Sequence, residues 1–200
     1  MQKSLLLSFI LLVTSWPAAE QATAQKMEYE IHWLGKVGKL SIQKLSRNDS
    51  LYIETNSEVK IPFYKFNWIT NTTSANGVLC RSKYSQLLNE KSRESREIRR
   101  LSYNKWKATD QDGKTELIDF IHTFYVSMLY FVEPVSETQI FSERFGKPLQ
   151  LINEGNGLYR LMLPDNNYCD YYYENGICKV VKAKNGSRTI KMILAENTGS

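Results

Sequence analysis

The chain has 200 residues and a formal net charge of +5, from 26 lysines and arginines against 21 aspartates and glutamates. This length suits one domain with a sizeable core, and the chain contains no internal repeat and no low-complexity tract. Aromatic residues make up 12% of the chain and tyrosine is the commonest of them, which favours strands over helices.

The first 24 residues have the pattern of a cleavable secretory signal peptide. Lys3 supplies a positive charge, residues 5–13 form an apolar run, and Ala22-Thr23-Ala24 forms a small-x-small cleavage site. The apolar run is shorter than the roughly 20 residues that cross a bilayer, and no later run is long enough to do so. We therefore expect cleavage between Ala24 and Gln25 and no membrane span in the mature chain. The mature protein is expected to be soluble and exported to the periplasm, with secretion as the alternative.

Alternating apolar and polar residues predict a series of strands after this segment. Asn-Gly and Asp-Gly pairs mark several of the intervening turns as tight hairpins. The expected strands lie at residues 28–33, from 40 to a turn at 47–50, 51–61, from 64 to a turn at 76–77, 78–88, 96–108, 139–141, 149–152, 158–163, 168–173, 177–183, and from 187 to about 194.

One segment interrupts this strand pattern. Residues 120–132 are apolar nearly all round, with apolar side chains at helical spacing, and Pro134 marks where a helix would end. A short helix that is apolar on every side must be surrounded by protein. The predicted fold is therefore mainly β: an antiparallel curved meander sheet or half-barrel (β-clam), with one short buried helix near residues 120–132, in a single domain spanning residues 25–200.

Positive charge is concentrated in the two predicted strands of the region 81–107. This region holds three glutamates and nine basic residues, namely Arg81, Lys83, Lys91, Arg93, Arg96, Arg99, Arg100, Lys105 and Lys107. Such a ribbon can bind anionic partners such as lipid headgroups or an envelope polymer. It can equally be the solvated face of a long hairpin whose charges protect a sheet edge.

Three cysteines occur, at positions 80, 169 and 178. A two-residue hairpin turn at Asn175-Gly176 would place Cys178 opposite Tyr173 and Cys169 opposite Lys182, about four residues apart along one face. A disulfide requires Cα atoms within about 7 Å. We therefore expect no disulfide and three reduced thiols.

Sequence signatures of catalysis and of cofactor or nucleic-acid binding are missing. The two histidines, His32 and His122, have no cysteine or aspartate at metal-ligand spacing, so we expect no metal site. No nucleophile elbow, phosphate-binding loop or dinucleotide-binding motif occurs, and no nucleic-acid-binding motif is found. The expectation is a protein that is not an enzyme, binds no nucleic acid and uses no cofactor.

Four motifs resemble a family of uncharacterised exported proteins of Gram-negative bacteria, described as a domain of unknown function. They are Gly-Lys-x-Gly at 35–38, Leu-Tyr-Phe-x-Glu-Pro at 129–134, Phe-Ser-Glu-Arg-Phe-Gly at 141–146, and the strand and turn at 168–176. The resemblance covers most of residues 25–200 and implies no known activity. Its architecture is distantly similar to that of periplasmic lipoprotein carriers, which implies an apolar hollow for acyl chains between a curved sheet and its helix.

Aromatic rows and the polar residues around the predicted helix are the candidate ligand contacts. The aromatic rows can line a hollow or be simply core. Glu143 and Arg144 can pair with each other, Arg144 can bind a carboxylate or phosphate, or Glu133 and Arg144 can hold the helix exit to the sheet. The candidate ligand-binding residues are Trp33, Tyr64, Phe66, Trp68, Tyr130, Phe131, Glu133, Glu143 and Arg144.

Two functions remain open from the sequence. The first is a non-enzymatic periplasmic binding or carrier protein for an apolar or acylated ligand, which requires that the helix does not fill the hollow completely. The alternative is a structural or assembly protein that docks on an envelope partner through the basic hairpin 81–107, which requires Arg96, Arg99 and Arg100 to lie on an exposed ribbon.

Overall fold

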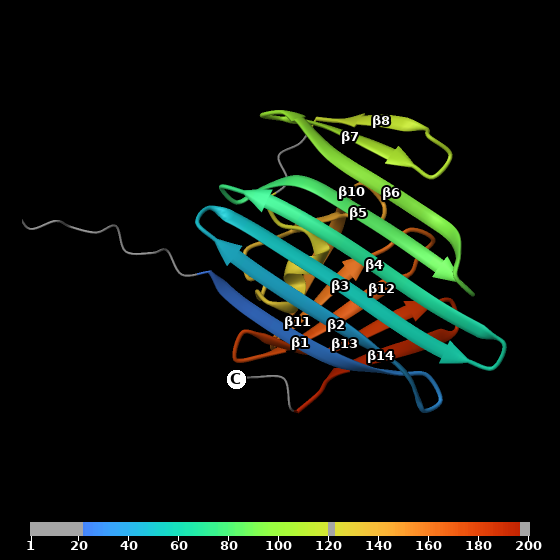
Figure 1. Ribbon diagram of the computed structural model, residues 1–200. Coiled ribbons are helices and arrows are strands. Elements are labelled where there is room, and N and C mark those ends of the chain that lie inside the picture. Colours follow the sequence, from blue (N-terminus) through green and yellow to red (C-terminus); the bar gives the residue numbers. More distant parts are fainter. Residues whose placement is uncertain (1–21, 120–122, 197–200) are drawn as a thin grey trace, which may run out of the picture.

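The computed structural model in Figure 1 describes residues 22–119 and 123–196. The predicted signal peptide lies almost entirely outside these residues, as do the first residues of the predicted helical run. The expected cleavage site, Ala24–Gln25, falls at the exposed beginning of the first strand.

Fourteen strands and one short 3₁₀ helix make up the described chain. Their bounds are β1 Thr23–His32, β2 Lys36–Arg47, β3 Ser50–Ile61, β4 Tyr64–Ala75, β5 Val78–Leu88, β6 Lys91–Ser102, β7 Lys105–Asp110, β8 Thr115–Ile118, η1 Val126–Tyr130, β9 Gln139–Ser142, β10 Lys147–Gly155, β11 Leu158–Met162, β12 Tyr168–Glu174, β13 Ile177–Asn185 and β14 Arg188–Leu194.

All the strands belong to one antiparallel sheet with two open edges. Each strand pairs with its neighbours in sequence, except that β8 does not pair with β9 and that β1 also pairs with β14. The spatial order therefore runs from β8 back to β1, and then from β14 back to β9. This arrangement confirms the predicted mainly β fold, an antiparallel meander that curls into a half-barrel.

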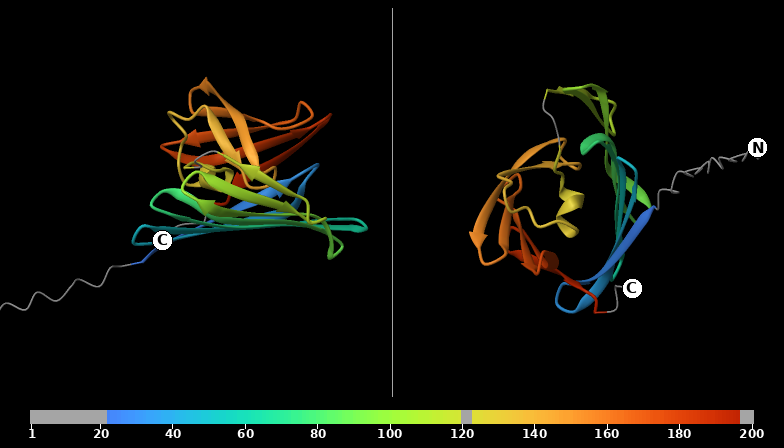
Figure 2. Two further views of the ribbon diagram at one scale, coloured as in Figure 1. Left: turned by 90° about the horizontal axis from the view of Figure 1, so that it is seen from above. Right: turned by 90° about the vertical axis from the view of Figure 1, so that its left-hand side faces the viewer.

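The sheet curls so that two walls face each other, with η1 between them (Figure 2, right). We call β1–β8 the N-terminal wall and β9–β14 the C-terminal wall. Alternation along each strand sends apolar side chains to the inner faces, where they form one continuous core. The Tyr29 hydroxyl of β1 donates a hydrogen bond of 2.8 Å to the Cys178 carbonyl of β13, which ties the two walls together inside that core.

Side chains, rather than strand pairing, join the walls where the sheet is open. Tyr125, just before η1, forms an isolated parallel bridge with Phe141 of β9. Its hydroxyl lies 3.1 Å from the Ser74 hydroxyl of β4, in a buried hydrogen bond. One tyrosine thus connects the C-terminal wall to the middle of the N-terminal wall.

Asn-Gly turns account for much of the regular spacing of the strands. In the turns at 76–77, 156–157 and 175–176, both central residues have positive φ, the conformation that joins two strands with the right-handed twist. Asparagine and glycine adopt this conformation at little cost. Each of these hairpins is therefore determined by two adjacent residues, and for this reason it could be predicted from the sequence.

The predicted helix is present and buried, but it is short. Within the described part of this run, residues 123–132, the helix spans residues 126–130, and Tyr125 before it is extended with φ −138° and ψ 161°. The long apolar run reflects burial between two walls rather than helical periodicity. A 3₁₀ helix rarely exceeds one or two turns, because its hydrogen bonds are less well aligned than those of an α-helix.

Three details of the strand predictions were wrong, the first being that β8 was not predicted at all. The strand expected at 96–108 is two strands, β6 and β7, separated by a turn at 103–104, and Leu101 sits in a bulge before that turn. A bulge also shifts the pairing of β12 with β13, so that Cys169 lies opposite Ala183 rather than Lys182. Cys178 does lie opposite Tyr173 as expected, and the two cysteines are therefore even further apart in register.

Gly38 in β2 is a position where the sheet leaves no room for a side chain. A Cβ atom there would collide with the Glu58 carbonyl oxygen of β3, a backbone atom that cannot move without breaking the pairing of Gly38 with Val59. We expect Gly38→Ala to lower the free energy of unfolding by about 1–3 kcal/mol. Urea denaturation measures the change, and Lys39→Ala at the exposed neighbour should leave stability within about 0.5 kcal/mol. Equal stability of the two variants would contradict the close strand approach.

Candidate functional site: the hollow between the walls

Two adjoining cavities lie between the walls, and we call them together the hollow. They share three lining residues: Thr55 of β3, Trp68 of β4 and Tyr130 of η1. One cavity, the apolar chamber, has a volume of about 250 Å³. The other, the polar chamber, has a volume of about 230 Å³. Together they fall within the roughly 300–1,000 Å³ typical of small-molecule sites.

The apolar chamber is lined by side chains of both walls. Ser57, which is 7% exposed, and Thr55 supply the only hydroxyls among the side chains that line it, apart from that of Tyr130. The remaining lining residues are Ile31, Leu40, Val59, Trp68, Ala183, Ile190 and Met192. Such a surface can hold an aliphatic or aromatic group but offers little to fix a polar one.

A row of stacked aromatic rings leads along β4 towards this chamber. Tyr64 stacks on Phe66 at 6.1 Å between ring centres, and Phe66 stacks on Trp68 at 5.7 Å. Tyr64, at the start of the strand, is half exposed, whereas Trp68 lines both chambers. The row expected from the sequence therefore exists, and it connects solvent to the interior.

The polar chamber is bordered by a forked ion pair. The Arg144 guanidinium, in the turn after β9, donates hydrogen bonds to both oxygens of the Glu94 carboxylate of β6, at distances of 2.9–3.3 Å. The same guanidinium lies over the ring of Phe145 at 5.0 Å and faces the ring of Tyr84 at 5.7 Å. This pair bridges the open seam of the sheet, and it engages Arg144 with a carboxylate of the chain itself; the predicted binding of a ligand carboxylate or phosphate by Arg144 stays a prediction.

Tyr84 offers the chamber a hydroxyl without a partner. Its ring is buried, and among the described residues no hydrogen-bonding group lies within reach of its oxygen. A buried hydroxyl that makes no hydrogen bond is costly, so this oxygen is an unsatisfied polar atom at the border of the chamber.

Glu143, which lines the polar chamber, fixes the position of η1 through hydrogen bonds. Its carboxylate is 3% exposed, and its two oxygens accept hydrogen bonds of 3.1 Å from the backbone N–H groups of Val126 and Ser127. Burial raises the pKa of the Glu143 carboxyl, and the hydrogen bonds from Ser127 and Val126 oppose that rise. Glu143 and Arg144 therefore do not pair with each other; each has its own partner on another segment.

Cys169 is the only thiol that lines the hollow in the described part of the chain. Burial raises its pKa to about 12, so the group is a neutral thiol rather than a nucleophilic thiolate at neutral pH. The nearby guanidinium of Arg144 binds the Glu94 carboxylate, and the Glu143 carboxylate binds backbone N–H groups. The chamber thus offers hydrogen-bonding and apolar contacts but no activated nucleophile.

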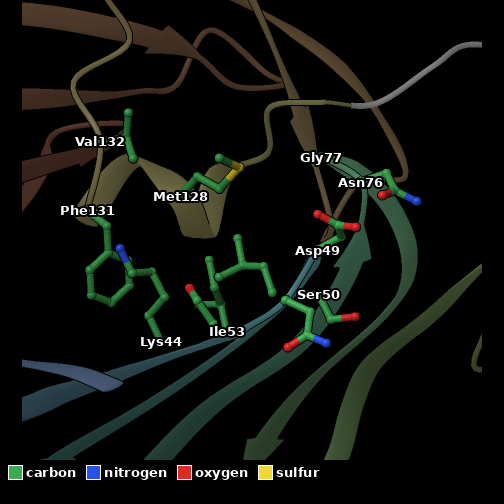
Figure 3. Close-up of a pocket in the computed structure, with 12 residues that line it drawn as sticks. Lys44, Asp49, Ser50, Ile53, Asn76, Gly77, Met128, Phe131 and Val132 are labelled. Atoms are coloured by element: carbon green, nitrogen blue, oxygen red, sulfur yellow. The ribbon is translucent and has the colours of Figure 1, made fainter. Parts of the chain in front are cut away.

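A third cavity, of about 320 Å³, lies on the other side of η1 (Figure 3). Met128, Phe131 and Val132 approach it from the helix side, and Lys44 reaches it from the inner face of β2. The Lys44 ammonium lies 4.9 Å from the centre of the Phe131 ring, and burial lowers the pKa of this lysine. We call it the Lys44 cavity; it can accept an apolar group that carries a single anionic atom.

The structure gathers only part of the predicted ligand set around the hollow. Trp68, Tyr130, Glu143 and Arg144 line it, whereas Phe131 lines the Lys44 cavity. Tyr64 and Phe66 form the aromatic row that leads to it.

Two predicted residues lie elsewhere. Trp33 lies in the turn after β1, with the Arg188 guanidinium 5.6 Å from its ring centre. Glu133 accepts a 3.0 Å hydrogen bond from the Tyr159 hydroxyl and so anchors the helix exit to β11, as one alternative expected, but Arg144 takes no part in that anchor.

Sequence reasoning missed several residues that the fold brings to these cavities. Thr55 and Ser57 fell only within the strand predicted at 51–61, Tyr84 within the strand predicted at 78–88, and Glu94 among the glutamates of the basic region 81–107. Lys44 had a usable signal, because it follows Leu40 and Ile42 at alternate positions and therefore lies on the inner face of β2.

Residues 22–119 and 123–196 lack both a cluster of metal ligands and a membrane-spanning helix. No group of three histidine, cysteine, aspartate or glutamate side chains there is placed to hold a metal ion. No helix in that part of the chain is long and apolar enough to cross a membrane. His32, one of the two histidines, contacts Glu30 at 3.2 Å, and His122 lies outside the described residues.

Comparisons with known proteins give a family but no activity. The family described as "Domain of unknown function (DUF6134)" matches residues 29–195. No curated protein shows a significant match. A solved β-barrel-like protein of the domain of unknown function DUF1849, from Brucella abortus, shares 9% identity and a TM-score of 0.48, over 88% of this chain and 98% of that one.

The Glu143 carboxylate makes stability depend on pH in a defined direction. Its pKa is raised in the folded state, so the folded protein binds more protons than the unfolded chain between the ordinary carboxyl pKa and the raised one. The free energy of unfolding should therefore fall as pH rises from about 4.5 through the folded-state pKa, and Glu143→Gln should remove that fall. Urea unfolding between pH 4 and pH 8 tests this, and parallel pH profiles for the two proteins would refute it.

Removing the side chain has a different effect from neutralising it. Glu143→Ala leaves the Val126 and Ser127 N–H groups buried without acceptors, and we expect it to cost about 2–4 kcal/mol at every pH. If Glu143→Ala is no less stable than Glu143→Gln, the carboxylate does not hold η1.

Proposed function

The chain belongs to the DUF6134 family of domains of unknown function, and we propose that it is a non-enzymatic carrier or binding protein for an apolar or acylated ligand. The ligand lies in the hollow between the two walls. The proposed location is the periplasm, which rests on the signal-peptide pattern of residues 1–24.

The observation that carries this proposal is that η1 does not fill the hollow. The helix closes one end of the space between the walls, and the apolar chamber of about 250 Å³ remains beyond Tyr130. Water in a cavity with so few polar partners is poorly held, so an apolar group gains free energy by displacing it. An acyl chain in the apolar chamber would place its polar end near Tyr84 and Arg144 in the polar chamber.

The chemistry of the lining supports binding rather than catalysis. Glu143 is committed to backbone N–H groups, Arg144 to Glu94, and Cys169 is a neutral thiol. None of these groups forms the base-activated nucleophile that covalent catalysis requires. The same groups are well suited to orient a bound molecule.

Filling the hollow should abolish ligand binding. Thr55 lies where the two chambers meet, and Ala183 lines the apolar chamber from the opposite wall. We expect Thr55→Phe and Ala183→Phe each to weaken binding of the neutral fluorophore N-phenyl-1-naphthylamine by at least about tenfold, because the added ring occupies the site. Fluorescence titration measures the affinity.

A matched control separates blocking from general damage. Thr73→Phe introduces the same ring on the outer face of β4 and should bind the fluorophore like the unaltered protein. Circular dichroism confirms that each variant is folded. Unchanged affinity in both folded hollow variants would rule out the hollow as the site, and native mass spectrometry of protein purified from its own envelope then shows whether any lipid binds elsewhere.

A second candidate function is docking on an anionic envelope partner, and a specific row of charges favours it. Arg81 pairs directly opposite Arg99, and Arg99 directly opposite Lys107, all exposed on the outer face of β5, β6 and β7. Like charges in directly opposed positions are destabilising. Glu97 offsets part of this repulsion by accepting hydrogen bonds from Arg81 at 2.9 Å and Arg99 at 2.6 Å.

The ribbon is narrower than the sequence indicated. Of the three arginines expected to be exposed on it, only Arg99 lies on the outer face. Arg96 packs against Gly146 of the C-terminal wall, and Arg100 binds the backbone of Ser102 and Tyr103.

The Lys107→Glu variant tests whether the row of Arg81, Arg99 and Lys107 binds an anionic partner or has no binding role. It creates an opposite-charge pair with Arg99, so we expect it to stabilise the fold by about 0.2–1 kcal/mol while weakening retention on the polyanion heparin. Lys147→Glu, at the exposed start of β10, changes the net charge equally and serves as the control. Equal salt concentrations for elution of the two variants would show that only net charge matters and would count against docking by this row.

A further inference from the structure

Two hairpin turns of the N-terminal wall hold large apolar side chains in full contact with solvent. Leu34, between β1 and β2, is 98% exposed, and Phe63, between β3 and β4, is 93% exposed. The next most exposed large apolar side chains reach 71%. Because the four strands form consecutive antiparallel hairpins, both turns lie at the same end of the sheet, on the right of Figure 1.

The backbone at both positions is unfavourable for these residue types. Leu34 has φ of 55° and Phe63 has φ of 68°, in the left-handed region that bulky side chains rarely adopt. Turns elsewhere in the chain place asparagine or glycine in this conformation, for instance Asn76 and Asn175. A strained leucine and a strained phenylalanine that pack against nothing point to a use outside the fold.

The exposed turns are held in place by hydrogen bonds. Asn89, from the turn between β5 and β6, donates a 3.2 Å hydrogen bond to the Phe63 carbonyl and accepts one of 2.8 Å from the Lys65 N–H. The Asn89 N–H also donates to the Lys65 carbonyl at 2.8 Å. In the other turn, the Trp33 N–H donates to the Gly35 carbonyl at 2.8 Å. The apolar side chains are therefore presented on ordered turns, which lowers the entropy lost on insertion.

Positive charge surrounds the two side chains. The turn regions 33–39, 60–65, 163–167 and 184–191 hold one acidic residue, Asp165, and seven basic ones: Lys36, Lys39, Lys60, Lys65, Lys184, Arg188 and Lys191. Exposed ion pairs with Glu30, Glu58 and Glu90 offset Lys36, Lys60 and Lys65 only weakly. Exposed apolar side chains at an end of the molecule that also carries many cations complement an anionic lipid surface: the apolar groups enter the bilayer interface and the cations attract its negative charge.

The apolar chamber of the hollow lies close to the same end of the molecule. Ile31, Val59 and Ile190 line the apolar chamber, and each lies within a few residues of one of these turns. Tyr64, next to Phe63, begins the stacked aromatic row that ends at Trp68. A surface that holds these turns would lie directly against the apolar chamber.

We propose that Leu34 and Phe63 insert into an anionic lipid surface and dock this end of the molecule, next to the apolar chamber, against it. An acyl chain can then pass between the bilayer and the apolar chamber along the aromatic row without crossing water. That exchange step rests on the proposed carrier function, whereas docking itself can be measured alone.

Substitution by asparagine separates docking from folding. Asparagine adopts left-handed backbone conformations readily, so Leu34→Asn and Phe63→Asn should raise the thermal denaturation midpoint. Each should at the same time weaken binding to vesicles of phosphatidylethanolamine and phosphatidylglycerol by about tenfold, because an inserted apolar side chain is lost. Cosedimentation of the purified protein with vesicles measures the affinity.

The controls fix how each outcome is interpreted. Val135→Asn, at another exposed apolar residue, should bind vesicles normally, and unaltered protein should bind phosphatidylcholine vesicles more weakly. Vesicle affinity that survives Leu34→Asn combined with Phe63→Asn overturns the proposal, and its loss in Lys107→Glu instead would assign lipid contact to the outer charge row. The two asparagine variants should still bind N-phenyl-1-naphthylamine, so a failure of docking is distinguishable from a failure of the hollow.

Discussion

The architecture depends on keeping a five-residue helix fixed at one end of the space between two walls. A 3₁₀ helix of this length has no stability of its own, so its position is set by contacts from both walls. The buried Glu143 carboxylate binds two N–H groups at its start, and the Tyr173 hydroxyl binds the Leu129 carbonyl near its end. The Tyr130 ring makes edge contacts with Tyr29 of one wall and Tyr171 of the other. Because the helix is held there, the apolar chamber of about 250 Å³ beyond Tyr130 stays unfilled.

Strands and tight turns were predictable because their signals are local. Alternation of apolar and polar residues fixes the inner face of each strand, and Asn-Gly pairs fix where hairpins occur. A bulge depends on how one strand pairs with its partner strand and not on the residues of one strand alone. For this reason the pairing of Cys169 and the break near Leu101 could not be predicted from the sequence. The helix was located correctly but its length was not, because an apolar run reports burial and not backbone conformation.

The site was less predictable than the fold. Trp68 and Tyr130 were predicted as candidate ligand contacts and do line the hollow, because large aromatic residues on an inner face border the space between the walls. The partner of Arg144 is 50 residues away on β6, and no spacing rule connects them. Leu34 and Phe63 showed the opposite problem: apolar residues in turns are usually packed, and only the three-dimensional structure shows that nothing covers them.

The pairing of β1 with β14 has a consequence for the chain's connectivity. It makes the order of strands circular: β1 to β8, then η1 and β9 to β14, and back to β1, with the gap in hydrogen bonding between β8 and β9. A circularly permuted gene that begins at β9 and ends at β8 would therefore encode the same sheet, with every pair of hydrogen-bonded neighbours adjacent in sequence. In the natural order, β1 with β14 is the one strand pair in the sheet whose members lie far apart in sequence. Each wall can therefore form from local hairpins before β1 and β14 pair and join the two walls.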